Sequence, residues 1–289
     1  MGKGSGSIPN PAYSLLRLTR PKQWIKNSFV LAPLIFARAY SDVGAIQNAL
    51  FAFGLFCVAS AACYIVNDIR DIERDRAHPV KSWSRPLAAR HVSMRAALIL
   101  LAALYVVLIA GFFILPAVAL PILGYIALNL AYSYFLKEQP VIDIFSVASG
   151  FVIRVWGGSA ALGVPLSSWM AITTLCLALF LASIKRRTEL AGAGSGGRKV
   201  LKEYSVTLVD RYAEMSAMGA LLFYSLFVMS TNPRLAGTIP LVLFGMFRYW
   251  YVVETREGGE TPTDVLLTDW PLIACILIWG GICVYALMP

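Results

Sequence analysis

Long apolar stretches follow one another along almost the whole chain, separated by short polar connections. Most approach the roughly 20 residues that an α-helix needs to cross the hydrocarbon core of a bilayer. Several contain proline or glycine, which membrane helices tolerate. The pattern therefore predicts an all-α, polytopic membrane protein with nine transmembrane helices, near residues 27–41, 44–66, 94–114, 117–136, 141–161, 167–185, 206–230, 236–253 and 270–288.

Basic residues are distributed unevenly over the connections between these spans. If the spans alternate in direction, 22 of the 25 Lys and Arg residues fall on the side of the N-terminus. The opposite side has only Arg38 and Arg234, and Arg154 lies inside the fifth span. Cytoplasmic loops carry such an excess of Lys and Arg. We therefore expect a multi-pass protein of the bacterial inner (plasma) membrane, with the N-terminus and the polar loops in the cytoplasm.

The composition agrees with a membrane protein, because charged residues are 14% of the chain against about 25% in soluble domains. Residues 1–10 are rich in Gly and Ser, and we expect a flexible tail there. Ala12–Arg20 reads as an interfacial amphipathic helix. Residues 11–289 are expected to form a single membrane domain with cytoplasmic loops near 67–93 and 185–205, and Ala191–Gly197 is a candidate lid. The five cysteines all lie in apolar runs without C-x-x-C spacing, which indicates buried side chains rather than a metal or disulfide framework.

An acidic run at the cytoplasmic end of the second span is the strongest chemical signal. On a continuous helix, Asp68, Asp71 and Asp75 fall within an arc of about 60°. Carboxylates this close repel one another unless a cation lies between them. Mg²⁺ binds through one or two carboxylates together with water and substrate phosphates. The spacing therefore predicts a clamp for Mg²⁺, or Mn²⁺ in its place, that holds a diphosphate leaving group.

The wider motif resembles a known family. The run Asn67-Asp68-x-x-Asp71-x-x-x-Asp75, with His78-Pro79, Lys81 and Arg85-Pro86 after it, is similar to the first signature of the UbiA-type intramembrane prenyltransferases. The resemblance implies a nine-helix bundle and metal held by Asp68, Asp71 and Asp75, with Asn67 in support. It also implies a polyprenyl chain in a lateral groove between helices.

One segment departs from that family. Typical members carry a second motif, Asp-x-x-x-Asp, after the sixth span, where this chain has Lys185-Arg186-Arg187-Thr188-Glu189. Lys185 and Glu189 are one helical turn apart and can face each other. A basic segment in place of two aspartates would favour binding of a phosphate group over binding of a second metal ion.

Five further segments resemble the decaprenyl-phosphate phosphoribosyltransferase subgroup of that family. They are Arg20-Pro21-Lys22-Gln23-Trp24-Ile25-Lys26-Asn27, Tyr132-Ser133 with Leu136-Lys137, Val141-x-Asp143, Lys185–Leu190, and Gly258–Asp264 followed by Asp269-x-Pro271-Leu272. The resemblance implies transfer of 5-phosphoribosyl from 5-phosphoribosyl 1-diphosphate to a polyprenyl phosphate. The product would be a precursor for lipid-linked arabinose, arabinogalactan and cell-wall synthesis.

The charge of the chain suits substrates with several phosphates. The net charge is +9, and Arg and Lys both bind phosphate well. A phosphate monoester is already ionised near pH 7, so no general base is expected. Candidate substrate-binding residues are Lys22, Lys26, Asn67, Lys81, Arg85, Tyr132, Lys137, Lys185, Arg186 and Glu189.

Two other functions remain open at this point. One is prenyl transfer from a prenyl diphosphate to an aromatic or glycerol-type acceptor, and the other is membrane transport. Transport would predict charges distributed along several spans, whereas only Arg154 is deep. We expect contacts with membrane lipids and none with nucleic acid, and the sequence does not indicate an oligomeric state.

Arg154 has two interpretations, because a charge inside a span is costly and usually functional. It could bind phosphate, or it could have a structural role. Asp143 lies on the same side of the helix, but the two residues are about 16 Å apart along its axis. A direct ion pair between them is therefore not expected.

Overall fold

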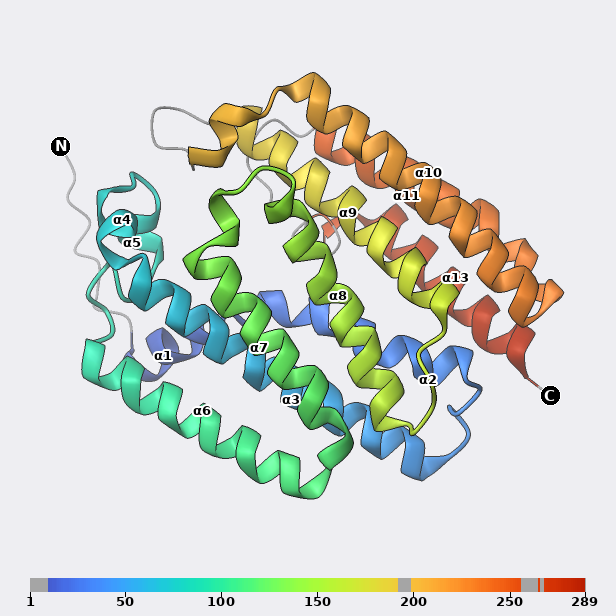
Figure 1. Cartoon of the computed structure of the whole chain (residues 1–289), viewed down its shortest axis with the longest axis horizontal. Helices are drawn as coiled ribbons and strands as arrows, with labels where there is room; N and C mark the ends of the chain where they lie inside the picture. Colours follow the sequence, from blue (N-terminus) through green and yellow to red (C-terminus); the bar gives the residue numbers. More distant parts are fainter. Residues whose placement is uncertain (1–9, 192–198, 256–264, 266–267, 289) are drawn as a thin grey trace.

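The computed structural model describes residues 10–191, 199–255, 265 and 268–288. Its long elements are helices that run back and forth across the molecule (Figure 1). They are α3 (Val43–Arg70), α6 (Met94–Ile114), α7 (Ala119–Tyr134), α8 (Ile142–Ala161), α9 (Ser168–Ala191), α10 (Val206–Thr231), α11 (Ile239–Thr255) and α13 (Trp270–Leu287). Short elements join them: α1 (Pro11–Thr19), η1 (Pro21–Leu31), α2 (Ala32–Phe36), α4 (Ile72–Ala77), α5 (Lys81–Ser84), η2 (Pro116–Val118), η3 (Leu136–Glu138), η4 (Lys199–Glu203) and η5 (Pro233–Thr238).

Eight segments of the described chain are helices long and apolar enough to span a membrane. The nine-span prediction differs at its first segment, which is not one long α-helix. There the chain forms η1 of 11 residues and α2 of 5 residues. At about 2.0 Å per residue in a 3₁₀-helix and 1.5 Å in an α-helix, the two reach about 30 Å, the thickness of the hydrocarbon core. The segment therefore has the length of a span without the regular helix, and η1 packs against α3 and α8.

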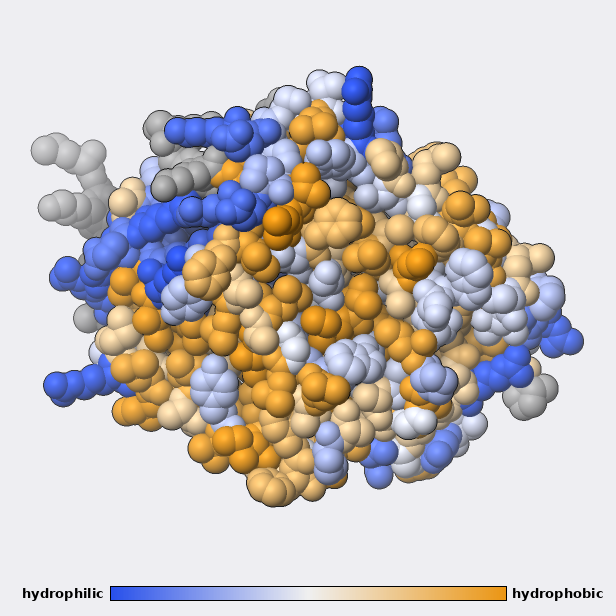
Figure 2. All heavy atoms as spheres, in the orientation of Figure 1, coloured by the Kyte–Doolittle hydropathy of each residue, from blue (hydrophilic) through white to orange (hydrophobic). Residues whose placement is uncertain are grey.

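The surface has the polarity of a bilayer protein. Apolar side chains cover the middle of the molecule, and hydrophilic ones gather at the end that carries α4 and α5 (Figure 2). On α6, Ile99, Val106 and Phe113 are spaced seven residues apart and are 71%, 65% and 84% exposed. Residues at this spacing share one helix face. That face is apolar and outward, as contact with lipid requires.

Two predicted segments lie mainly outside the described residues. These are the N-terminal tail, of which only Asn10 is described, and the candidate lid, of which only Ala191 is described. Asn10 caps the N-terminus of the first helix, because its side chain accepts a hydrogen bond from the Ala12 backbone N–H. The predicted amphipathic helix is confirmed as α1, with Leu18 buried while Tyr13 and Leu16 are exposed. All five cysteines are free, and four of them are buried.

Close packing at two glycines fixes η1 and α3 against α8. A Cβ added at Gly158 would lie 2.0 Å from the Val30 carbonyl oxygen, and one at Gly157 would lie 2.3 Å from the Phe56 ring. Small residues at membrane helix interfaces permit this approach. Since Asn27 is one turn before Val30, the Gly158 contact also sets the position of the polar side of η1.

We expect Gly158→Ala to destabilise the fold by about 1–3 kcal/mol, because its methyl group meets backbone that cannot rotate away. Thermal unfolding in detergent measures the effect. Gly54→Ala on α3 is the matched control, because nothing lies within 4 Å of its added Cβ and alanine favours a helix. Equal unfolding temperatures for the two variants would contradict this packing account.

Candidate functional site

The acidic run begins on α3 and crosses a break in the helix. Asp68 lies in the last turn of α3, Asp71 follows its end with φ −91° and ψ 11°, and Asp75 is on α4. The prediction of a continuous helix through all three was therefore wrong. The ψ angle of Asp71 departs from the helical value of about −42° and redirects the chain there. Asp68 and Asp75 are buried, and Asp71 is partly exposed.

Each carboxylate has cations of its own. Arg20 and Arg85 both bind Oδ1 of Asp68, with Nη1 of Arg85 at 3.2 Å. Nζ of Lys137 lies 2.8 Å and 2.9 Å from the two carboxylate oxygens of Asp71. The negative charges of Asp68 and Asp71 are thus neutralised by different cations.

The third carboxylate is paired as well, since Nζ of Lys81 lies 3.5 Å from Oδ1 of Asp75. Within the described ranges, no group of three His, Cys, Asp or Glu residues is close enough to hold a metal ion. The three-carboxylate clamp predicted from helical spacing is therefore not assembled in this arrangement. Substrate phosphates, which compete for the same cations, are the groups that could release the carboxylates.

The donors at this end still suit a hard divalent cation. Among the described residues, Oδ2 of Asp68 is buried and has no hydrogen-bond partner, and a buried anionic oxygen is costly when unpaired. Oδ1 of the neighbouring Asn67 accepts a hydrogen bond from the Ser133 hydroxyl at 3.2 Å. Mg²⁺ favours one or two carboxylates with water and substrate phosphates. Asp68 and Asp71 can supply that number without a third ligand.

A cavity of about 250 Å³ opens beside the acidic run, between η1 and helices α3, α7, α8 and α9. Nine of the thirteen predicted site residues line it: Lys26, Asn67, Asp71, Asp75, Lys81, Arg85, Tyr132, Lys137 and Lys185. Asp68 lies behind Arg20 and Arg85, which do line the cavity. Lys22 is exposed and outside this lining, so its predicted place in the pocket is not supported.

Cations greatly outnumber carboxylates in this wall. Eight lining residues are basic and two are acidic: Arg20, Lys26, Arg74, Lys81, Arg85, Lys137, Arg154 and Lys185 against Asp71 and Asp75. Like charges in a partly buried space repel strongly, since the effective dielectric constant is below that of water. The cavity is therefore suited to a ligand that carries several negative charges.

In the segment that replaces the second aspartate motif, Lys185 faces the cavity and Arg186 faces away from it. Nζ of Lys185 lies 3.8 Å from Oε1 of Glu189, the predicted one-turn pair, and Lys185 lines the cavity. Arg186 instead turns inward, with Nε 2.5 Å from Oδ2 of Asp143 and Nη1 2.6 Å from Oε2 of Glu189. Arg186 and Glu189 do not line the cavity. Their predicted direct contact with substrate is therefore not supported.

This inner network reaches the cavity through one tyrosine. Nη2 of Arg186 donates to the Tyr132 hydroxyl at 3.1 Å, and Tyr132 lines the cavity. On the other side, the Tyr204 hydroxyl donates to Oδ1 of Asp143 at 2.6 Å. Burial raises the pKa of Tyr204 above its usual value, so the hydroxyl keeps its proton. Arg186 and Asp143 therefore position the wall of the site.

Arg154 is buried at the inner end of the cavity. Its Nε donates to Oδ1 of Asn27 at 2.7 Å, its Nη1 to the Gly150 carbonyl at 2.8 Å, and its Nη2 to the Tyr125 hydroxyl at 2.9 Å. Asp143 instead pairs with Arg186, so the expectation that Arg154 and Asp143 do not form an ion pair is confirmed.

Sequence reasoning missed Arg20, Arg74, Tyr64 and Tyr125 as lining residues. Arg20 is the first residue of the Arg-Pro-Lys-Gln-Trp-Ile-Lys motif, in which residue type alone favours Lys22 and Lys26 as phosphate contacts. Arg20 ends α1 with a left-handed backbone, φ 53°. That turn directs its side chain to Asp68 and above the Tyr64 ring, 4.7 Å from the ring centroid. Such a turn was not apparent from residue types.

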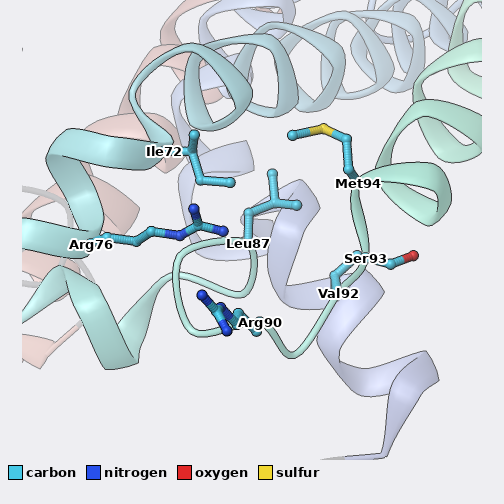
Figure 3. Close-up of a pocket in the computed structure, with 7 residues that line it drawn as sticks. All are labelled: Ile72, Arg76, Leu87, Arg90, Val92, Ser93 and Met94. Atoms are coloured by element: carbon cyan, nitrogen blue, oxygen red, sulfur yellow. The ribbon is translucent and has the colours of Figure 1, made fainter.

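A second cavity, of about 300 Å³, lies between α4, the 85–93 connection and the start of α6 (Figure 3). It is lined by Ile72, Leu87, Val92 and Met94 together with Arg76, Arg90 and Ser93. No carboxylate lines it, and it holds none of the predicted site residues. This cavity is therefore not the one that gathers the candidate chemistry.

Comparison with known proteins shows the family to which the chain belongs. The UbiA prenyltransferase family matches residues 28–265. The decaprenyl-phosphate phosphoribosyltransferase of Corynebacterium glutamicum is 37% identical over 285 residues, covering 93% of this chain and 85% of that protein. The protein of the same name from Mycolicibacterium smegmatis is 34% identical over 300 residues, covering 96% and 93%.

Solved structures show the same fold. A UbiA homologue from Archaeoglobus fulgidus bound to GPP and Mg²⁺ superposes with a TM-score of 0.73 at 19% identity, covering 94% of this chain and 99% of that one. The family match covers most of the chain, and the relatives align over nearly their full lengths. This chain is therefore a multi-pass membrane protein of the UbiA prenyltransferase family.

Proposed function

We propose that this chain is a transferase that moves a 5-phosphoribosyl group from 5-phosphoribosyl 1-diphosphate to a polyprenyl phosphate. Decaprenyl phosphate is the acceptor named for its bacterial relatives. The product, a 5-phosphoribosyl-1-phosphoryl polyprenol, would serve lipid-linked arabinose and cell-wall synthesis. The observation that carries the proposal is the excess of eight basic over two acidic residues in the cavity wall.

That excess favours the ribose donor over a prenyl donor. A prenyl diphosphate brings one diphosphate, whereas the ribose donor brings a diphosphate and a 5-phosphate, and the lipid acceptor adds another phosphate. The phosphate groups of the ribose donor and the lipid acceptor need many cations, because each uncompensated charge in a partly buried site is costly. Lys185 supplies a cation in the cavity wall, at the position where other family members have an aspartate.

The transfer itself needs positions and charges more than proton transfer. The bond between C1 of the ribose and the diphosphate oxygen breaks, and the electron pair leaves with the diphosphate. A phosphate oxygen of the lipid forms the new bond to C1. The lipid phosphate is already largely ionised near pH 7, since its second pKa is about 6, so no catalytic base is required.

The residues around the acidic run act on the leaving diphosphate. Asp68 and Asp71 would hold a divalent cation, Mg²⁺ or Mn²⁺, which neutralises the charge that develops on the leaving group. Lys81, Arg85 and Lys137 are already placed beside these carboxylates. Fixed cations aimed at developing charge are usually the largest contribution to catalysis.

The polar end of the molecule is proposed to face the cytoplasm of a bacterial inner membrane. It carries α4 and α5 and the mouth of the cavity, and most Lys and Arg residues of the chain belong to its loops. A water-soluble ribose donor would enter there. The lipid phosphate would reach the same site from the membrane between helices.

A two-donor assay tests this function. The purified protein, reconstituted with decaprenyl phosphate and Mg²⁺, is given 5-phosphoribosyl 1-diphosphate labelled in the ribose. We expect the label in the organic phase, and diphosphate released in equal amount. The parallel reaction uses labelled geranyl diphosphate with an aromatic or a glycerol-type acceptor. Label transfer only in that reaction would refute the proposal in favour of prenyl transfer.

A further inference from the structure

The deep end of the cavity holds cations without carboxylate partners. Lys26 and Arg154 both line the cavity, and neither has an acidic residue at ion-pair distance in the described part of the chain. Lys26 is also repelled by Arg154, Lys185 and Arg20. Arg154 is buried and Lys26 is half-buried, and a charge removed from water without a partner is costly. Cations kept in such a place require an anion that the protein itself does not provide.

Arg154 is held ready for such an anion. A guanidinium has five N–H donors. Neutral groups accept from three of those of Arg154, and the other two have no partner among the described residues. Asn27 is fixed in turn, because its Nδ2 donates to the Ser60 hydroxyl at 3.0 Å and to Sγ of Cys57 at 3.2 Å. The guanidinium also lies above the Tyr125 ring, 4.6 Å from its centroid. A side chain held from several directions does not need to reorganise when a ligand binds.

This place is separate from the acidic run. Arg154 is twelve residues after the start of α8, about 18 Å along the helix axis, whereas Asp143 is near that start. The cations that pair with Asp68, Asp71 and Asp75 do not include Lys26 or Arg154. One cavity therefore has a mouth where cations and carboxylates alternate and an inner end where only cations lie.

We infer that Lys26 and Arg154, with Tyr125, form a second anion subsite that binds a phosphate monoester. The inference rests on the proposed function for the identity of the ligand, since that reaction has two phosphate monoesters. They are the 5-phosphate of the ribose donor and the phosphate of the lipid acceptor. The metal-bound diphosphate stays at the mouth, where the carboxylates are.

Two variants and one control test the subsite. Arg154→Gln removes the buried guanidinium, and Lys26→Met removes a charge that makes no hydrogen bond with the described residues. Lys26→Met is expected to fold at least as well as the wild type, because it relieves repulsion. Arg70→Gln is the matched control, since Arg70 also contacts a tyrosine, with its guanidinium 4.3 Å from the Tyr134 ring centroid and 3.2 Å from the Tyr134 carbonyl. It lies outside the cavity lining.

The readout is equilibrium binding of ribose 5-phosphate and of farnesyl phosphate to the detergent-solubilised protein. We expect the Kd of one of these probes to rise at least tenfold in Lys26→Met and in Arg154→Gln, and to stay within twofold in Arg70→Gln. A change for ribose 5-phosphate assigns the subsite to the donor, and a change for farnesyl phosphate assigns it to the acceptor.

Unchanged binding of both probes in a folded Lys26→Met protein would overturn the subsite. Because binding is measured without turnover, the test does not depend on the transfer reaction. A protein that binds a phosphate monoester through Lys26 but transfers no phosphoribosyl group would retain the subsite and lose the proposed function. The two failures are thus distinguished.

Discussion

Asp68→Asn and Asp71→Asn are each expected to lower the transfer rate by at least about a hundredfold, with folding intact. Each change keeps the shape of the side chain and removes the negative charge that a divalent cation needs. Loss of one group that stabilises developing charge typically costs about 10²–10³ in rate. The initial rate at saturating donor and Mg²⁺ measures the effect, and the thermal unfolding temperature shows that the fold is kept.

Glu73→Gln is the control for this pair of variants. Glu73 is on the neighbouring helix α4, is 81% exposed in its side chain, and pairs with Arg76 outside the cavity. Its loss should leave the rate within twofold of the wild type. Wild-type rates in both aspartate variants would remove the acidic run from the chemistry.

Asp143→Ala is expected to destabilise the protein by about 3–5 kcal/mol, the usual effect of removing one partner of a buried ion pair. The Arg186 side chain is 3% exposed and that of Asp143 is 0% exposed. Among the described residues, alanine would leave the guanidinium with Glu189 as its one acidic partner, and the Tyr204 hydroxyl would lose its acceptor. Chemical denaturation in detergent micelles measures the difference.

Two comparisons sharpen this second prediction. The exposed pair of Glu73 and Arg76 should matter little, with less than about 1 kcal/mol for Glu73→Ala. The double variant Asp143→Leu with Arg186→Met should regain much of the stability, because neither charge is then left buried. If Asp143→Ala unfolds like the wild type, Arg186 is not held by this pair.

The sequence was most informative where one residue type repeats over a long distance. Apolar runs of membrane length predicted the helices, since every backbone polar group in lipid must be bonded within its own segment. The first segment was the exception, because composition shows that a span is apolar but not whether its turns are α or 3₁₀. The close packing of η1 and α3 on α8 depends on Gly157 and Gly158, where a larger side chain would not fit.

The candidate site was predicted less completely, because its residues come from five separate parts of the chain. Asp71 breaks the helix that helical spacing assumed to be continuous. Arg186 has the charge expected of a substrate contact, but whether it turns to Asp143 or to the cavity depends on the rotation of α9. Arg20 reaches Asp68 only through a left-handed turn after α1. Such choices depend on tertiary packing, which residue type alone does not encode.

Phosphoribosyl transfer at this site requires that the acidic run bind a metal together with the diphosphate of an activated ribose. An experimental structure with 5-phosphoribosyl 1-diphosphate and Mn²⁺ tests it, with the anomalous signal of Mn²⁺ as the readout. We predict that signal beside the carboxylates of Asp68 and Asp71, with the diphosphate among Lys81, Arg85 and Lys137. Mn²⁺ bound away from both aspartates, or the donor bound outside this cavity, would contradict the account.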